Sequence, residues 1–173
     1  MFLQAYEQIK DMNLAQFRPK KPVSSEPHLA FKIKFENEKV QGDGGPYRQF
    51  FEDVSMELQP TKLEQSVSSR LLSLLMPCTN QLYNEQEGKD KFMLNSEKTS
   101  SSDLSLYYFL GVLMGVCIRT GAKMILDLPR MVWKQLVGQK INMDDIAEVE
   151  TSFVKTISQV LQKSESEYEN EPL

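Results

Sequence analysis

Two cysteines and one histidine are among the residues of this 173-residue chain whose types could support nucleophilic catalysis. A Cys/His or Ser/His site needs a general base beside its nucleophile, and the one imidazole, His28, stands in a proline-rich connection. Cys117 lies inside an apolar run, and Cys78 follows a proline with no basic neighbour. A reactive thiol needs an exposed, electropositive setting. We therefore expect no active site in this chain, and we expect Cys117 to be a small buried core residue.

A glycine-rich turn, Gly42-x-Gly44-Gly45, precedes a helix that begins at Pro46 and is a second candidate for chemistry. The backbone amides of such a turn can hold phosphate, but a phosphate-binding loop adds a Lys-Ser/Thr pair at the start of the helix. That pair is missing, so a phosphate-binding domain is a minor alternative. The glycines fit a tight turn with positive φ, and valine at Gly44 or Gly45 should strain the turn if φ is positive there.

Three further patterns favour a structural role. Gly111 and Gly115 form a GxxxG pair in an apolar helix, which lets another element approach closely, so Gly111→Leu should destabilise by about 1–3 kcal/mol through overpacking. Asp144 and Asp145 indicate a helix start that is stabilised by the helix dipole, rather than a metal pair. Trp133, which lies at helical spacing among apolar residues, is expected in the core. We predict no cofactor and no metal site.

The composition indicates an ordinary globular protein, with 40% hydrophobic and 25% charged residues. Its length corresponds to one domain or to a subdomain of a larger protein. The net charge is −4 and there is no large basic block, so nucleic acid is not suggested as a partner. The two cysteines are far apart and no signal-peptide pattern begins the chain, which favours a reducing, cytoplasmic location.

The element that should organise the fold is a helix over residues 101–121. Ser101, Ser102 or Asp103 can cap its start, and Gly121 can end it in the left-handed conformation. Its residues are apolar on nearly every side, which is typical of a helix buried in a core. The apolar run, residues 104–118, is shorter than the roughly 20 residues that a membrane span needs. We therefore predict a buried central helix and no membrane span.

The other elements follow from periodicity and from proline and glycine positions. They are helices over residues 2–12, 46–59, 129–138, 143–146 and 149–161, a possible helix over 62–75, a loop over 81–90, and short strands over 31–35 and 91–95. In the first strand Phe31, Ile33 and Phe35 should face the core. The predicted fold class is mainly α with a few short β-strands (α+β). Residues 1–163 should form one helical body, and the acidic residues 164–173 a disordered tail.

Five segments in sequence order resemble the catalytic domain of HECT-type ubiquitin ligases. Residues 31–36 and 42–51 are similar to a strand, a GG turn and an "R-x-F-F"-like helix of that family. Residues 109–119 resemble its "F-x-G-x-x-x-G-x-x-I" core helix, residues 126–138 resemble the next helix, which ends in Leu-x-Gly, and residues 144–146 match an "L-x-D-[LI]" segment. Within the family, the sequence of these segments most resembles the giant HERC ligases, in particular the first member of that group.

The resemblance implies that the chain is the large helical subdomain of a HECT N-lobe. The family pairs the N-lobe with a C-lobe, whose cysteine accepts ubiquitin from a conjugating enzyme as a thioester and transfers it to substrate lysines. Neither Cys78 nor Cys117 matches that cysteine, whose segment would lie beyond residue 173. The resemblance therefore implies a ubiquitin transferase as the parent protein and an inactive scaffold as this fragment.

The resemblance also implies partners. Ubiquitin and a ubiquitin-conjugating enzyme should bind the complete HECT domain, which then acts on substrate proteins. In some relatives a second ubiquitin sits near the short strands, and the matching residues here are Tyr83, Phe92 and Leu94. The alternative reading is a non-catalytic helical module that binds a partner peptide in a groove between its helices.

Overall fold

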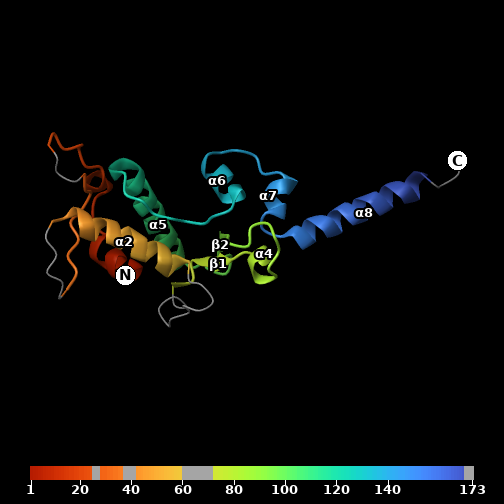
Figure 1. Ribbon diagram of the computed structural model, residues 1–173, viewed down its shortest axis with the longest axis horizontal. Helices are drawn as coiled ribbons and strands as arrows, with labels where there is room; N and C mark the ends of the chain where they lie inside the picture. The colour runs from red at the N-terminus through yellow and green to blue at the C-terminus, as the bar shows by residue number, and fades with distance from the viewer. Residues whose placement is uncertain (25–27, 37–41, 60–71, 170–173) are drawn as a thin grey trace. The chain divides into compact units, whose positions relative to one another are not determined.

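Helices predominate in the computed structural model, together with one small antiparallel sheet of two strands (Figure 1). The predicted class, mainly α with a few short strands, is therefore confirmed. The structure describes residues 1–24, 28–36, 42–59 and 72–169, with side chains as far as residue 163. Most of the possible helix predicted over residues 62–75 lies outside the described residues, but Leu75 begins a strand.

The chain divides into two compact units, unit 1 (Met1–Leu75 and Leu94–Leu126) and unit 2 (Met76–Met93 and Asp127–Leu173). Unit 1 contains the helices α1 (Phe2–Ile9), α2 (Gly44–Leu58) and α5 (Ser101–Thr120), and the short 3-10 helix η1 (Leu14–Phe17). Unit 2 contains α4 (Thr79–Leu82), α6 (Arg130–Leu136), α7 (Met143–Ala147) and α8 (Thr151–Glu169). The paired strands are β1 (Leu75–Pro77) and β2 (Phe92–Leu94).

The long helix α5 has the bounds that its sequence predicts, and local caps fix them. Its N-cap is Ser100, one residue before the candidates named from the sequence, and Ser100 forms a reciprocal capping box with Asp103. The hydrogen bond from the Ser100 hydroxyl lowers the pKa of Asp103. Gly121 ends the helix at φ +73°, a left-handed conformation that glycine adopts at little cost.

One face of α5 packs into the core of unit 1 and the other is exposed. Its buried side chains are Phe109, Leu110, Leu113, Val116 and Cys117. On the opposite side Leu104, Tyr108 and Ile118 are 58%, 61% and 86% exposed. We expected α5 to be buried on every side, but one of its faces is exposed. Apolar residue types alone do not ensure that other elements of the chain pack against each face of a helix. By length and composition, α5 is also the one helix among the described residues that could cross a membrane.

No described part of the chain lies close to the GxxxG pair of α5. A Cβ atom on Gly111 or on Gly115 would meet no atom of the described residues within 4 Å. The expected close approach of another element is therefore wrong, and so is the overpacking expected for Gly111→Leu.

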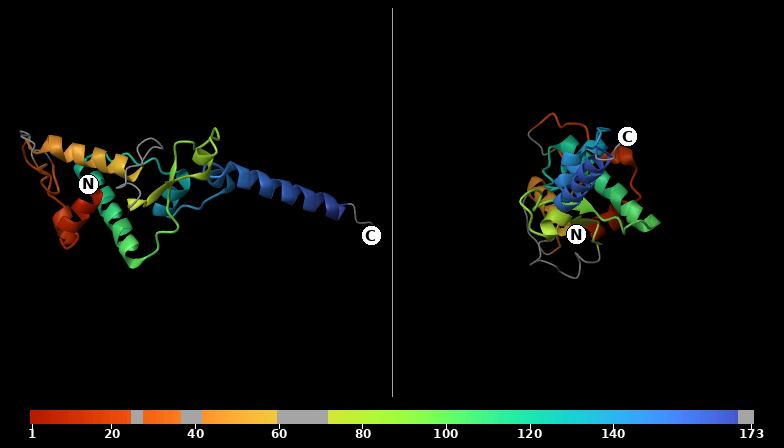
Figure 2. Two further views of the ribbon diagram at one scale, coloured as in Figure 1. Left: turned by 90° about the horizontal axis from the view of Figure 1, so that it is seen from below. Right: turned by 90° about the vertical axis from the view of Figure 1, so that its right-hand side faces the viewer.

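Helix α2 is the second long helix of unit 1 (Figure 2), and it begins two residues before the predicted start. Gly44 and Gly45 lie inside the helix, and φ is positive only earlier, at Gly42 (+89°). Since φ is not positive at Gly44 or Gly45, the backbone strain predicted for valine at these positions does not apply. Pro46 occupies the first turn, where its missing N–H leaves no bond unmade. The helix buries Tyr47, Phe50, Phe51, Val54 and Leu58 on its inner face.

The segment over residues 31–35 alternates in burial but forms no strand. Its three apolar side chains, predicted to face the core, are half-buried, and its two lysines are exposed. The Phe31 ring centroid lies 5.4 Å from that of Tyr47, 5.9 Å from Phe50 and 6.2 Å from Phe17. The predicted strand is wrong because the sheet of the described residues contains only β1 and β2, and the segment is held by ring packing instead of backbone pairing.

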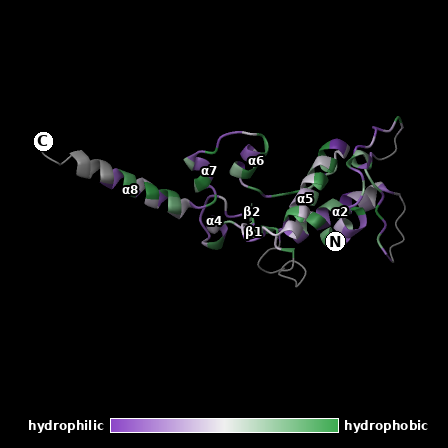
Figure 3. Ribbon diagram, turned by 180° about the vertical axis from the view of Figure 1, so that it is seen from behind, coloured by the Kyte–Doolittle hydropathy of each residue, from purple (hydrophilic) through white to green (hydrophobic). Residues whose placement is uncertain are grey.

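In unit 2, the predicted elements after residue 90 are present. Pro129 caps α6, and Gly138 follows this helix at φ +71°. Strand β2 and helix α7 lie within one residue of their predicted bounds. Helix α8 continues to Glu169, past residue 161, where the apolar spacing ends. Figure 3 shows hydrophobic and hydrophilic residues alternating along α8, as in an amphipathic helix. The division at residue 163 stays a prediction.

Candidate functional site

Neither cysteine is placed to act as a nucleophile. Cys117 is buried in α5, and burial raises the pKa of its thiol to about 11, so the thiol is protonated at neutral pH. Cys78 is 2% exposed and its Sγ donates to the carbonyl oxygen of Gly88 at 3.1 Å. The His28 ring lies against the Pro19 carbonyl oxygen, with Nε2 at 3.3 Å. Among the described residues, His28 and Cys78 thus each contact a backbone carbonyl oxygen and not one another.

In unit 2, side-chain hydrogen bonds and an ion pair hold the junction between α6 and α7. Asp145 is 1% exposed, and its Oδ2 accepts from Lys134 Nζ at 2.6 Å and from the Asn142 N–H at 2.9 Å. The hydrogen bond from Lys134 is the largest cause that lowers the pKa of Asp145. Asn142 in turn caps α7 through a reciprocal capping box with Asp145. The neighbouring Asp144 is exposed. Both aspartates lie in the first turn of α7, so the acidic pair is at a helix start, as predicted.

A second tie joins the start of α6 to the end of α7. Glu148 Oε2 accepts from the backbone N–H of Arg130 at 2.9 Å and from its Nε at 3.1 Å. The Glu148 carbonyl oxygen packs against Gly88, where an added Cβ would lie only 1.9 Å away. Gly88 also has a positive φ of +61°, so two independent constraints favour glycine in this loop. Together these contacts fix the loop after α4 against α7.

Asn80 connects α4 to the turn between α7 and α8. Its Nδ2 donates to the Ala147 carbonyl oxygen at 2.7 Å, and its Oδ1 accepts from the Thr151 N–H at 2.8 Å. Its own N–H donates to the Val149 carbonyl oxygen at 2.9 Å. Asn80 is 1% exposed, and it satisfies backbone groups that would otherwise be buried without partners. Sequence reasoning did not single out this residue, since its partners are about 70 positions away.

These ties hold α4 so that its C-terminal end presents apolar side chains to solvent. Leu82 is 50% exposed and Tyr83 is 75% exposed. Of the two β2 residues predicted to face ubiquitin, Leu94 is 45% exposed, whereas Phe92 is 6% exposed. Phe92 therefore belongs to the core and its side chain is not on the surface. Its N–H donates to the Asp127 carbonyl oxygen at 2.8 Å, which anchors the strand.

The sequence profile of the HECT-domain (ubiquitin-transferase) family matches residues 66–172. The chain belongs to the HECT-domain family. All of the contacts described for unit 2, and the residues predicted to face ubiquitin, lie inside this HECT match. The glycine turn and α2 precede it.

Curated relatives include ubiquitin ligases that are much longer than this chain. Mouse "E3 ubiquitin-protein ligase HERC2" is 34% identical over 128 residues, which cover 74% of this chain and 2% of the relative. Human HERC2 is 33% identical over the same length and shares. Human "Probable E3 ubiquitin-protein ligase HECTD4" is 31% identical over 170 residues, which cover 96% of this chain and 4% of the relative. The resemblance to HECT ligases is confirmed, while the finer likeness to the first HERC member stays a prediction.

Proposed function

We propose that this chain is the large helical part of the N-lobe of a cytoplasmic HECT-type E3 ubiquitin ligase. In the longer protein, a cysteine outside residues 1–173 attacks the thioester that links ubiquitin to a conjugating enzyme, and the conjugating enzyme's thiol is released. A substrate lysine amine then displaces the cysteine and forms an amide. The burial of both cysteines of this chain supports the proposal, because a thiol that must accept ubiquitin has to be exposed to it.

In this proposal the chain itself is a scaffold. The ties centred on Asp145, Glu148 and Asn80 give unit 2 a fixed local structure. We assign Tyr83 and Leu94 as residues that contact ubiquitin, because each presents an exposed apolar side chain. Phe92 has the separate role of anchoring β2 in the core.

A thioester assay tests the transfer half of the proposal. The chain, and a longer protein extended through the complete HECT domain, are each incubated with activating enzyme, conjugating enzyme, ATP and ubiquitin, and are resolved with and without reductant. We expect a reductant-sensitive adduct on the longer protein alone, and we expect it to persist when Cys78 and Cys117 are replaced by alanine. An adduct on the 173-residue chain that disappears in either alanine variant would refute the scaffold role.

Titration of isotope-labelled ubiquitin with the chain tests the contact residues. We expect Tyr83→Ala and Leu94→Ala to weaken the chemical-shift changes, because each removes exposed apolar contact area. Val23→Ala is the matched control, since Val23 is also apolar and fully exposed. Equal effects of the three substitutions would rule out the assigned residues and leave the transferase proposal untouched.

A further inference from the structure

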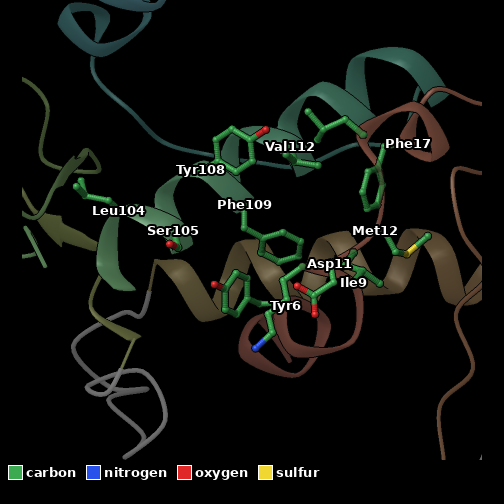
Figure 4. A pocket seen from close by; sticks show the side chains of 12 residues that line it. Tyr6, Ile9, Asp11, Met12, Phe17, Leu104, Ser105, Tyr108, Phe109 and Val112 are labelled. Carbon is green, nitrogen blue, oxygen red and sulfur yellow. The ribbon is translucent and has the colours of Figure 1, made fainter. Parts of the chain in front are cut away.

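Unit 1 contains a groove that the proposed function does not use. It has a volume of about 410 Å³ and is lined by α1, the turn after it, η1 and the first half of α5. Figure 4 shows Tyr6 and Phe109 in its middle, Leu104 at one end and Phe17 at the other. The Phe109 ring packs edge-on against Tyr6 with centroids 5.5 Å apart, so the floor is a fixed aromatic surface.

The walls of the groove expose large apolar side chains. Leu14 is 44% exposed, Leu104 is 58% exposed and Tyr108 is 61% exposed, and all three line it. Covering such a contiguous apolar surface is favourable, and surfaces of this kind commonly mark interaction sites. Leu104, Tyr108 and Val112 follow one another at a spacing of four residues along α5, which spans about 12 Å of helix. A groove with this row of contacts suits the apolar face of a short helix.

The charged residues at the rim of the groove indicate which charge a bound segment should carry. Lys10 and Asp11 are the charged residues that line the groove. Lys10 Nζ is already held by Glu7 Oε2 at 2.5 Å and lies 5.5 Å from the centre of the Tyr6 ring. The Asp11 carboxylate is exposed and makes no ion pair among the described residues. Glu7 and Asp11 both attract Lys10, and two carboxylates beside one ammonium group leave this rim with a net negative charge that complements a further basic group.

We propose that this groove binds an amphipathic helical segment of a partner protein, with apolar residues at i, i+3 or i+4, and i+7, and with a lysine or arginine that pairs with Asp11. The apolar residues of the segment cover Leu104 and Tyr108, and the basic residue sets its direction. The inference goes beyond the ubiquitin-transfer proposal, because it needs only unit 1 and no thioester.

Fluorescence anisotropy with two designed probes tests the proposal. Both are labelled 16-residue helical peptides with leucine at i, i+3, i+4 and i+7, and they differ only in carrying one lysine or one glutamate beside the leucine row. We expect the lysine peptide to bind about two- to fivefold more tightly, as is typical of a partly exposed ion pair. Asp11→Asn should abolish this preference, and Asp11→Lys should reverse it. Glu52→Gln, at an exposed acidic position on α2, is the control and should leave it unchanged.

Leu104→Ser tests the apolar contact and should weaken both peptides about tenfold. Ile118→Ser is its matched control, since Ile118 is an exposed apolar residue of α5 that does not line the groove. Circular dichroism confirms that each variant is folded.

Three results would overturn the proposal. One is equal binding of the lysine and glutamate peptides to the unmodified chain. Another is self-association that Leu104→Ser abolishes and Ile118→Ser preserves, which would identify a second copy as the occupant. The third is binding to this chain but none to the longer protein, which would identify a segment of the same protein as the occupant.

Discussion

The carbonyl oxygen of Glu148 lies where a side chain on residue 88 would have to begin. A Cβ on Gly88 would stand 1.9 Å from that oxygen and 3.0 Å from the carbonyl carbon. The obstructing atoms belong to the backbone at the end of α7, so they cannot move aside as the tip of a side chain can. The same residue has φ +61°, a conformation that costs other residues roughly 1–2 kcal/mol. This contact joins the loop after α4 to α7.

We predict that Gly88→Ala destabilises unit 2 by on the order of 3 kcal/mol, since it adds a backbone clash to the cost of positive φ. Gly138→Ala is the matched control, because Gly138 has φ +71° but its Cβ would meet no described atom within 4 Å, and it should cost only about 1–2 kcal/mol. Urea unfolding measures both, and hydrogen exchange locates the loss. Equal losses of unfolding free energy in the two variants would show that the contact with Glu148 adds nothing to the cost of positive φ.

Local signals in the sequence were enough to place α5, because both of its ends depend on neighbouring residues. Its start depends on Ser100 and Asp103, three positions apart, and its end on Gly121. The segment at residues 31–35 shows the limit of such signals. Its alternation correctly predicted which side chains are half-buried, but whether a strand forms depends on a pairing partner elsewhere in the chain.

The ties of the candidate site were not predictable from local pattern. Asn80 is defined by hydrogen bonds to Ala147 and Thr151, which are 67 and 71 positions away. Among the predicted ubiquitin-facing residues, Phe92 and Leu94 are on the same short strand, yet one is buried and the other is exposed. Alternation predicts that two such residues share a face, but β2 has only three residues and lies at an edge of the core, where burial changes along the strand.

We predict that Gly111→Ala stabilises unit 1 by about 0.5–1 kcal/mol, because alanine has the higher helix propensity and its Cβ would meet open space. Gly121→Ala serves as the contrast, since the same methyl group at φ +73° should destabilise by roughly 1–2 kcal/mol. Thermal unfolding distinguishes the two signs. A lower melting temperature for Gly111→Ala would mean that another element covers this face of α5.

The buried thiol of Cys117 should react slowly while the protein is folded. Burial raises its pKa to about 11, so few thiolates exist at pH 8 and access is blocked. We predict that in a Cys78→Ala variant alkylation by iodoacetamide at pH 8 is at least tenfold slower without urea than in a urea concentration that unfolds the chain. The raised pKa also means that the folded state holds this proton more tightly than the unfolded state. The contribution of the protonated Cys117 thiol to the free energy of unfolding is therefore lost as pH rises from about 9 towards 11. Rapid labelling without urea would contradict the placement of Cys117 in the core.

The ion pair between Asp145 and Lys134 should make the stability of unit 2 depend on acid pH. Lys134 and the Asn142 N–H lower the pKa of Asp145 in the folded state below its ordinary value, which is about 3.9. The folded state therefore prefers the carboxylate, and its contribution is complete above that ordinary pKa and is lost as pH falls through the lowered one.

We predict that Asp145→Asn lowers the free energy of unfolding at pH 7, and that the difference from the unmodified chain shrinks as pH falls below about 4. Asp144→Asn, at the exposed neighbouring position, is the control and should show a smaller difference at pH 7. Urea unfolding at a series of pH values, followed by circular dichroism, provides the comparison. A difference for Asp145→Asn that stays constant between pH 7 and pH 3 would mean that the substitution acts through packing alone, because only the charged form of Asp145 can pair with Lys134.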